Sequence, residues 1–372
     1  MKIAIEAQRI FRVNKHGMDF VALEVIRELQ KIDRENEYFI LVNAGEDRCL
    51  EESENMHIVT VNAPLYPLWE QVCLPETVRR IGPDILHCTG NTAPLRCDVP
   101  LVLTLHDIIF LEKRSGSSPS WYQNMGWYYR RFVVPRVLPK CRRIITVSNY
   151  ERERIGSALQ IGGDRLVAVY NGYGSHFRPV ESPYEVTRKY LPEKEYLFFL
   201  GNTDPKKNTA RTLRAYALYA RQTERPLPLL VADIPENVID GILKEQQISD
   251  VKPLLRLPGY IPNGDLPSVY CGAKIFLYTS LRESFGIPML EAMACGTPVV
   301  TSDTSAMPEV AGSGAVLVDP TDETQIAGAV RRLLDDPQLY ERQRAYGLER
   351  VKQFSWRKTA EQTLDVYKSV GL

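Results

Sequence analysis

The sequence lacks the features that define several common classes of protein. Lysine plus arginine and aspartate plus glutamate both total 46, so the formal net charge is zero and no overall field attracts nucleic acid. The seven cysteines are odd in number, are widely spread and include no C-x-x-C pair, which is typical of reduced thiols in the cytosol. These absences argue against a nucleic-acid-binding protein and against a disulfide-stapled secreted domain.

The chain also lacks a long apolar run. The longest, residues 100–111, is interrupted by His106 and Asp107 and is far shorter than the roughly 20 residues that span a bilayer. The N-terminal residues MKIAIEAQRIF carry no signal-peptide pattern. The sequence therefore predicts a cytoplasmic protein, for which any contact with the inner face of the cell membrane is peripheral.

Several catalytic motifs are missing as well. There is no D-x-D triplet to hold a divalent metal against a diphosphate, no G-x-x-x-x-G-K-[ST] loop and no H-E-x-x-H pair. A Rossmann oxidoreductase would carry G-x-G-x-x-G after a strand, and neither half of the chain contains it. We therefore expect chemistry that uses no metal and no resident cofactor.

The chain is long enough to form two domains. It has 372 residues, of which 44% are hydrophobic and 25% charged, as is usual for globular proteins. Short β-rich runs alternate with helical patterns, which predicts an α/β fold with parallel sheets covered by helices on both faces. The expected strands are residues 2–7, 38–43, 57–63, 84–90 and 100–107 in the first half, and 165–171, 195–201, 228–233, 254–260, 273–280, 297–303 and 315–319 in the second.

The domain boundary is predicted from a cluster of turn-forming residues. Glycine, proline and serine cluster in residues 171–185, between the two sets of strands. A helical pattern follows Ser355, a good N-cap residue, near the end of the chain. We expect residues 1–175 and a returning C-terminal helix, 355–372, to form the first domain, and residues 176–354 to form the second.

The segment LRESFGIPMLEAMACGTPVV is predicted to be a loop that runs into a short helix. Pro288 suits the first helical turn and Gly296 suits the C-terminal cap, which places Glu291 in the first turn and Glu283 in the loop. Free backbone N–H groups there bind anions, and a carboxylate can hold two vicinal sugar hydroxyls. Each glutamate alone also has an ordinary interpretation, as a charge that favours the helix N-terminus or as a solvated loop charge.

Two adjacent lysines precede another predicted helix. Lys206 and Lys207 follow the strand 195–201 and come just before a helix that starts near Thr209. Cations at this position can neutralise a diphosphate leaving group. The alternative is a pair of lysines that face solvent.

Together these residues resemble the donor site of the family 4 glycosyltransferases, enzymes of the GT-B fold, in which two Rossmann-like domains face each other across a cleft. The resemblance covers the E-x7-E pattern, the EAMACGTPVV segment and the TSDTSAMPEVAG loop. It implies that Glu291 binds the nucleotide ribose and that Glu283, Lys207 and His106 act in catalysis. The implied donor-binding set is completed by Ser284, Phe285, Gly286, Ile287, Lys206, Gly201 and Gly17.

Other positions match the family less closely. Many members carry an arginine where this chain has Asn202, which leaves the second phosphate partner open, with Lys206 as a candidate. Gly17 is a single glycine where the family has a glycine-rich loop, and it can equally be a simple turn. Three further matches are expected to line the cleft or the acceptor site: Asp107, Ser148 and Asn171.

Residues 120–143 combine aromatic and basic side chains at near-helical spacing. Such a pattern suits a membrane interface or a lipid-linked anionic acceptor. It also suits an ordinary helix with a buried aromatic face and a solvated basic face. The sequence leaves both interpretations open.

The resemblance implies a retaining, metal-independent hexosyltransferase. Its partners would be a nucleotide-sugar bound mainly by the second domain and a glycan or lipid-linked acceptor bound mainly by the first. The PKKN and MPEVAG segments are similar to the bacterial polysaccharide branch, whose members often use GDP-mannose. A UDP-sugar donor and a non-catalytic nucleotide-sugar-binding protein are the alternatives.

Overall fold

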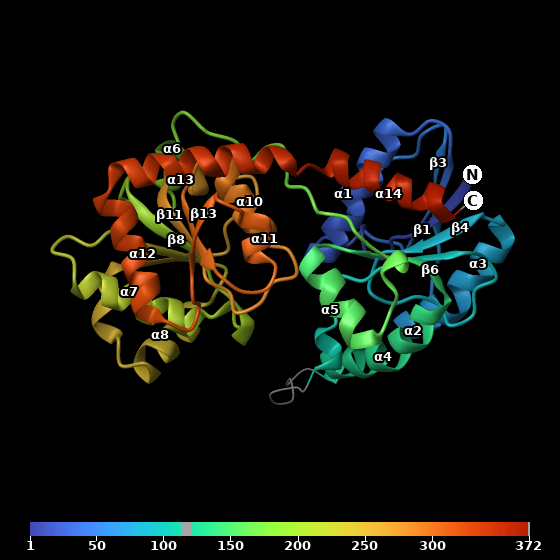
Figure 1. Cartoon of the computed structure of the whole chain (residues 1–372), viewed down its shortest axis with the longest axis horizontal. Helices are drawn as coiled ribbons and strands as arrows, with labels where there is room; N and C mark the ends of the chain where they lie inside the picture. Colours follow the sequence, from blue (N-terminus) through green and yellow to red (C-terminus); the bar gives the residue numbers. More distant parts are fainter. Residues whose placement is uncertain (113–120, 371–372) are drawn as a thin grey trace. The chain divides into compact units, whose positions relative to one another are not determined.

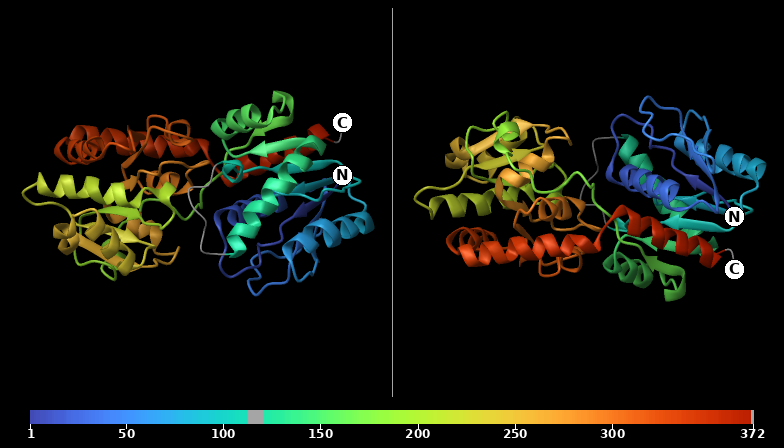
Figure 2. Two further views of the ribbon diagram at one scale, coloured as in Figure 1. Left: turned by 90° about the horizontal axis from the view of Figure 1, so that it is seen from below. Right: turned by 90° about the horizontal axis from the view of Figure 1, so that it is seen from above.

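The computed structural model describes residues 1–112 and 121–370, with the side chains of residues 121–123 left out. The chain divides into two compact units, drawn in Figure 1 and from two further sides in Figure 2. The first unit comprises residues 1–172 together with the segment from Trp356 onward, and the second comprises residues 173–355. Each unit contains its own parallel sheet.

The sheet of the first unit has the strand order β3-β2-β1-β4-β5-β6-β7 over the described residues. All its pairings are parallel; for example, Ile5 of β1 lies opposite Ile40 of β2 and His87 of β4. Its strands are β1 (Lys2–Glu6), β2 (Glu37–Val42), β3 (Met56–Thr60), β4 (Ile85–Cys88), β5 (Leu101–Thr104), β6 (Cys141–Thr146) and β7 (Leu166–Ala168).

Two features of this sheet differ from the sequence prediction. Strand β6 was not expected, because it begins with a basic cysteine-arginine-arginine run and its apolar part is only a few residues long. The segment 165–171 was listed with the strands of the second half, but it supplies β7, which pairs with β6 at the edge of the first sheet, in agreement with the predicted boundary after residue 175.

The helical elements of the first unit cover both faces of its sheet. They are α1 (Gly17–Ile32), α2 (Tyr66–Leu68), the π-helix η1 (Trp69–Cys73), α3 (Leu74–Ile81), η2 (Ile109–Leu111), α4 (Trp121–Val137), η3 (Leu138–Lys140), α5 (Asn149–Leu159), η4 (Gly163–Arg165) and α14 (Trp356–Val370). Side chains alternate along each strand, so Ala4 and Leu86 join the core beneath α3 and α4 while Ile5 and His87 face α1 and α14.

The C-terminal helix packs on the first unit, as the sequence predicted. Figures 1 and 2 show α14 (red) beside α1 (blue). The Tyr367 hydroxyl lies 2.6 Å from His87 Nδ1, and the Thr359 hydroxyl donates to the Tyr170 carbonyl at 2.7 Å. Polar contacts therefore fix the helix against the sheet in addition to apolar packing.

The sheet of the second unit has the order β10-β9-β8-β11-β12-β13. Its strands are β8 (Tyr196–Leu200), β9 (Leu229–Ala232), β10 (Leu255–Gly259), β11 (Ala273–Tyr278), β12 (Val299–Ser302) and β13 (Ala315–Val318). Its helical elements are α6 (Tyr184–Thr187), η5 (Pro205–Lys207), α7 (Thr209–Arg221), α8 (Glu236–Glu245), η6 (Ser249–Leu254), α9 (Leu266–Gly272), α10 (Ile287–Ala294), α11 (Met307–Ala311), α12 (Glu323–Asp335), α13 (Pro337–Arg350) and η7 (Val351–Gln353).

The two faces of the second sheet are packed differently. On one face, α7 buries residues at helical spacing, including Leu213, Tyr216 and Ala220, against alternate strand residues such as Leu197. On the other face, the ring of Tyr270 from α9 packs edge-on against Phe198 of β8, at 5.3 Å between ring centroids. In neither unit is a described helix both long and apolar enough to cross a membrane.

Candidate functional site

The strand order of the second sheet marks the place where a ligand is expected. From the central pair β8 and β11 the chain builds outward in opposite directions, through β9 and β10 on one side and β12 and β13 on the other. At such a switch point the loops after the two central strands diverge and leave a crevice beyond their carboxyl ends. The loops here are residues 201–208 and 279–286, which carry the lysines and the first glutamate singled out in the sequence.

The two loops meet through an ion pair. Lys207 Nζ lies 2.6 Å from Glu283 Oε1, and both side chains are largely shielded from solvent. The ammonium group also lies 5.8 Å from the centroid of the Tyr278 ring. Burial and the neighbouring Glu283 carboxylate raise the pKa of Tyr278 well above its ordinary value, so this ring stays neutral. The structure therefore brings together the two residues that the sequence assigned to catalysis in this half of the chain.

Hydrogen bonds to backbone groups hold both loops in place. Asn208 adopts a left-handed conformation, with φ of 62°, and its side-chain amide donates to the carbonyls of Thr279 and Pro320 at 2.9 and 2.7 Å. The amide of Leu281 donates to the Lys206 carbonyl at 2.7 Å, and the amide of Glu283 donates to the Ser305 hydroxyl at 3.0 Å. The lysines and Glu283 are thus mounted on a hydrogen-bonded frame.

The loop after β11 enters α10 through a strained glycine. Gly286 has φ of 105°, and a Cβ atom there would lie 3.3 Å from the Tyr278 ring. The side chain of Phe285 is buried against Phe354, at 5.8 Å between ring centroids, so only its backbone remains to meet a ligand. Ser284 and Ile287 are half-buried on either side. A ligand at this loop would therefore meet its backbone groups and not the Phe285 side chain.

Glu291 lies on α10, but the predicted place in the first turn is wrong. The helix starts at Ile287, so Glu291 is in its second turn, and Gly296 follows the capping residue Cys295 with φ of 78°. The carboxylate accepts a 3.3 Å hydrogen bond from the Tyr270 hydroxyl. Burial raises the pKa of Glu291 to about 7. This half-buried carboxyl can accept hydrogen bonds from ligand hydroxyls, which would stabilise its ionised form.

Gly201 and Lys206 frame the loop after β8. A Cβ atom on Gly201 would lie 2.5 Å from Ile234 Cγ2 and 3.0 Å from the Ala232 carbonyl oxygen, so packing alone requires glycine there. Lys206 Nζ lies 3.6 Å from a carboxylate oxygen of Asp204 on the same turn. Lys207 pairs with Glu283 in the loop after β11, whereas Lys206 pairs within its own turn, so the two lysines are not equivalent.

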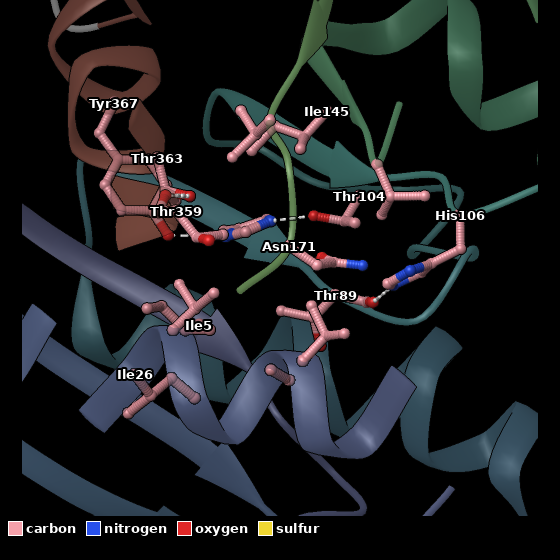
Figure 3. A pocket seen from close by; sticks show the side chains of 16 residues that line it. Ile5, Ile26, Thr89, Thr104, His106, Ile145, Asn171, Thr359, Thr363 and Tyr367 are labelled. Carbon is pink, nitrogen blue, oxygen red and sulfur yellow. Dashed lines mark hydrogen bonds between the residues drawn. The ribbon is translucent and has the colours of Figure 1, made fainter. Parts of the chain in front are cut away.

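His106 and Asp107 follow β5 in the first unit. His106 is buried; its amide donates to Asn91 Oδ1 at 2.6 Å, and its Nε2 lies 3.0 Å from the Thr89 carbonyl (Figure 3). Burial lowers the pKa of His106, and because a carbonyl only accepts, Nε2 carries the proton of the neutral ring. Asp107 accepts from the amide of Ile109 and closes a turn.

His106 and Asn171 line one pocket of the first unit, between the sheet, α1 and α14 (Figure 3). His87 also lines this pocket and lies between the Tyr367 and Thr104 hydroxyls at 2.6 and 2.8 Å. Burial lowers the pKa of His87 to about 3, so its ring is neutral at physiological pH. The sequence did not single out His87, because it lies inside a strand and no motif marks it.

Ser148 has a local structural role, and no contact requires glycine at position 17. The buried Ser148 hydroxyl accepts from the amide of Glu151 and caps α5. Gly17 is the first residue of α1, is exposed and would accommodate a Cβ atom with nothing within 4 Å. Neither residue lines the pocket that contains His106.

A second pocket lies beyond β1 and β4, which form the switch point of the first sheet. Glu6 ends β1, and its carboxylate accepts from the amides of Gln8 and Thr89 at 3.0 and 3.2 Å. Burial raises the pKa of Glu6 to about 7. Sequence reasoning missed this pocket, although a glutamate at the end of a hydrophobic strand was the available signal.

The aromatic and basic stretch forms α4 from Trp121 onward, and Ser120 lies outside the described residues. Tyr129 faces inward and donates to Glu70 Oε2 at 2.5 Å. Tyr128 and Phe132 are 66% and 53% exposed, and the Arg136 guanidinium lies 4.0 Å from the centroid of the Phe132 ring. The helix thus has one buried aromatic face and one exposed aromatic and basic face, and membrane contact stays a prediction.

Comparisons with known proteins identify the family. Residues 16–174 match "Glycosyltransferase Family 4", and residues 187–350 match "Glycosyl transferases group 1". The chain is 32% identical over 271 residues to the O-antigen chain mannosyltransferase B of Escherichia coli, which covers 72% of this chain and 70% of that protein.

Solved structures share the fold over nearly the whole chain. Sucrose-phosphate synthase from Thermosynechococcus elongatus has a TM-score of 0.76 at 18% identity, with 99% of this chain and 98% of that chain covered. HepE of Anabaena, solved in complex with UDP-glucose, has a TM-score of 0.74 at 17% identity, with 99% and 100% covered. At these identities the two structures show the GT-B type of fold.

Proposed function

This chain belongs to the family 4 glycosyltransferases, and on that premise we propose that it transfers mannose from GDP-mannose to a glycan or lipid-linked acceptor in surface-polysaccharide or glycoconjugate assembly. The observation that carries the proposal is the Lys207–Glu283 pair at the switch point of the second sheet, with Glu291 on the helix that follows. The mannosyltransferase relative supports mannose as the sugar.

Glu291 is proposed to bind the nucleotide ribose. Its carboxyl is held by burial and by the Tyr270 hydroxyl, with capacity to accept further hydrogen bonds. Two vicinal ribose hydroxyls supply the two donors that such a group can accept. The position on α10, just past the Gly286 turn, is then the nucleotide end of the site.

Lys207 is proposed to stabilise the diphosphate as it leaves. The bond between the anomeric carbon and the diphosphate oxygen breaks, and negative charge develops on that oxygen; a fixed ammonium group there stabilises the transition state more than the ground state. Glu283 orients Lys207 and accepts from hydroxyls of the donor sugar, while Lys206 and the loop 281–286 backbone supply further positive potential. These cations would do the work of a metal ion.

We further propose that the anomeric configuration is retained by front-face attack. The acceptor oxygen bonds to the anomeric carbon on the side that the diphosphate leaves, and its proton passes to the departing phosphate oxygen. No enzyme nucleophile is needed, and positioning together with charge stabilisation supplies most of the rate enhancement. His106 of the first unit is proposed to form a hydrogen bond with the donor sugar. Its ring is neutral, and its Nε2 is held by the Thr89 carbonyl.

The test is a nucleotide screen followed by turnover. Purified protein is scanned for thermal stabilisation by GDP, UDP, ADP and dTDP, and hydrolysis of the matching nucleotide-sugars is then measured. Stabilisation by GDP and hydrolysis of GDP-mannose are expected. Stabilisation by UDP instead would favour the alternative donor, in line with the UDP-glucose complex of HepE. Nucleotide binding without any turnover would indicate a non-catalytic protein, and binding of none would overturn the proposal.

A further inference from the structure

The pocket at the carboxyl ends of β1 and β4 contains a buried side-chain carbonyl that has no hydrogen-bond partner among the described residues. Gln8 is 7% exposed and lines the pocket, and its Oε1 atom is buried without a hydrogen-bond partner among the residues that the structure describes. The backbone groups of Gln8 are engaged, with the amide donating to Glu6 and the carbonyl accepting from Asn43. Burying an unpaired carbonyl is unfavourable, so its retention in a pocket points to a ligand that donates.

Glu6 adds a second hydrogen-bond acceptor beside Gln8. Its side chain is 5% exposed, and each carboxylate oxygen accepts one backbone hydrogen bond, from Gln8 and from Thr89. A carboxylate has about four lone-pair directions, so capacity remains for donors from a ligand. Burial raises the pKa of Glu6 to about 7, and donors that satisfy the carboxylate would favour its ionised form.

The surroundings of the pocket disfavour an anion. Asp19, which also lines the pocket, accepts from the amide of His16 at 2.9 Å and so places a carboxylate at the N-terminus of α1, which disfavours a phosphate there. The Arg9 guanidinium lies 5.2 Å from the centroid of the Tyr66 ring. The pocket lining thus contains two carboxyl groups, of Glu6 and Asp19, and one guanidinium, of Arg9, and a ligand phosphate would add to the negative charge.

Tyr66 forms a rigid wall of the same pocket. Its hydroxyl donates to Glu70 Oε1 at 2.6 Å and lies 2.7 Å from the Thr92 hydroxyl. Glu70 is 1% exposed and belongs to the π-helix η1, a kind of irregular turn that is frequent at functional sites. The ring is therefore fixed in orientation before any ligand arrives.

We propose that this pocket binds the terminal sugar of the acceptor and selects a neutral, hydroxyl-rich ring over a sugar phosphate. The inference rests on the proposed glycosyl transfer and adds the chemical class of the acceptor. Gln8 and Glu6 accept hydrogen bonds from ring hydroxyls, and Tyr66 limits the orientation of the ring. Glu70 is a positioning residue, because it acts through Tyr66.

The experiment measures sugar binding without any donor. Saturation-transfer NMR is recorded for the full chain with methyl α-D-mannopyranoside and, separately, with mannose 1-phosphate. Saturation transfer to the neutral sugar and at least fivefold less to the phosphate is expected. No transfer to the neutral sugar, or more to the phosphate, would overturn the proposal. This comparison needs no variant and so does not depend on how a substitution folds.

A variant pair then assigns the binding to Gln8. Gln8→Leu removes the unpartnered carbonyl at nearly constant volume, and Gln30→Leu is the control, because Gln30 lies on the exposed side of α1 and bonds the Glu51 carbonyl. The Gln8→Leu variant should bind the neutral sugar about tenfold more weakly, with a Tm no lower than that of the wild type, and Gln30→Leu should bind normally. Equal binding by both variants would remove Gln8 from the site.

The two proposals fail in different ways. Thermal stabilisation by a nucleotide tests the second unit and does not involve Gln8 or Glu6. A protein that is stabilised by GDP but gives no signal with the neutral sugar would retain the donor assignment and lose the acceptor pocket. The reverse result would leave a sugar-binding first unit in a protein without the proposed donor.

Discussion

Both sheets have a switch point in their strand order, but the side chains at the two switch points differ in charge and hydrogen-bonding capacity. In the first unit the switch point between β1 and β4 is lined by carboxyl and amide acceptors, with Glu6 and Gln8 buried. In the second unit the switch point between β8 and β11 carries a pair of lysines and a glycine-bearing loop. Topology therefore determines where a ligand is expected, and side chains determine whether that ligand donates hydrogen bonds or carries negative charge.

The largest effect should come from removing the cation of the second switch point. Lys207→Met should lower kcat by about 10²–10³-fold, because the leaving diphosphate loses a fixed charge and Glu283 loses its 2.6 Å partner. Steady-state kinetics with the nucleotide-sugar found in the screen measures this. Lys206→Met is the matched control, since Lys206 pairs with Asp204 on its own turn and not with the opposite loop, and it should cost tenfold or less. A larger loss of kcat in Lys206→Met than in Lys207→Met would mean that Lys206, and not Lys207, stabilises the leaving diphosphate.

The comparison also shows how far sequence reasoning reaches. The central strands of both units follow from short, nearly continuous apolar runs, and α7 and the returning C-terminal helix follow from apolar positions that repeat every 3.6 residues. Strand β6 was missed, since its first residues are basic. Strand β7 was listed with the strands of the second half, although the predicted boundary after residue 175 already placed it in the first domain, where it pairs with β6.

The candidate site divides in the same way. Lys207 and Glu283 were found because each follows a central strand within a family motif, and their contact depends on strand adjacency that the sequence does not display. Glu291 was placed in the first turn of its helix but lies in the second, since α10 already begins at Ile287, one residue before Pro288. Glu6 and Gln8 escaped notice because a single acid and a single amide form no motif until β1 and β4 are seen to be neighbours.

The two glycines of these regions offer a second contrast. Gly201→Ala should lower the free energy of unfolding by about 1–3 kcal/mol, because the new Cβ would lie 2.5 Å from Ile234 Cγ2 and 3.0 Å from a carbonyl oxygen. Gly17→Ala should leave stability within about 0.5 kcal/mol, since nothing lies within 4 Å and surface changes are usually that small. Urea denaturation measures both. An equal loss of unfolding free energy in the two variants would contradict this contrast, because it would mean that position 17 also disfavours a Cβ atom.

The protonation state of Glu291 provides a finer test of the proposed ribose-binding site. Its pKa of about 7 lies above the ordinary 4.5, so its contribution to stability is complete below about pH 4.5 and is lost as the pH rises through about 7. Ribose hydroxyls that donate to the carboxylate should lower this pKa, so nucleotide binding near pH 6.5 should release a fraction of a proton. Calorimetry in buffers of different ionisation enthalpy measures the release. Glu291→Gln should abolish it and weaken nucleotide binding about tenfold; an unchanged release would assign the proton to another group.

The smallest expected effect is that of a chelator. If Lys207 and its neighbours stabilise the diphosphate in place of a metal ion, turnover with excess EDTA should stay within twofold of the untreated rate, because the cations are covalently part of the chain. The control adds Mg²⁺ back after chelation and should change little. A rate that falls sharply with EDTA and is restored by Mg²⁺ would show that a metal ion binds the diphosphate together with the lysines. The cationic character of the second switch point would then depend on that metal ion as well as on its lysines.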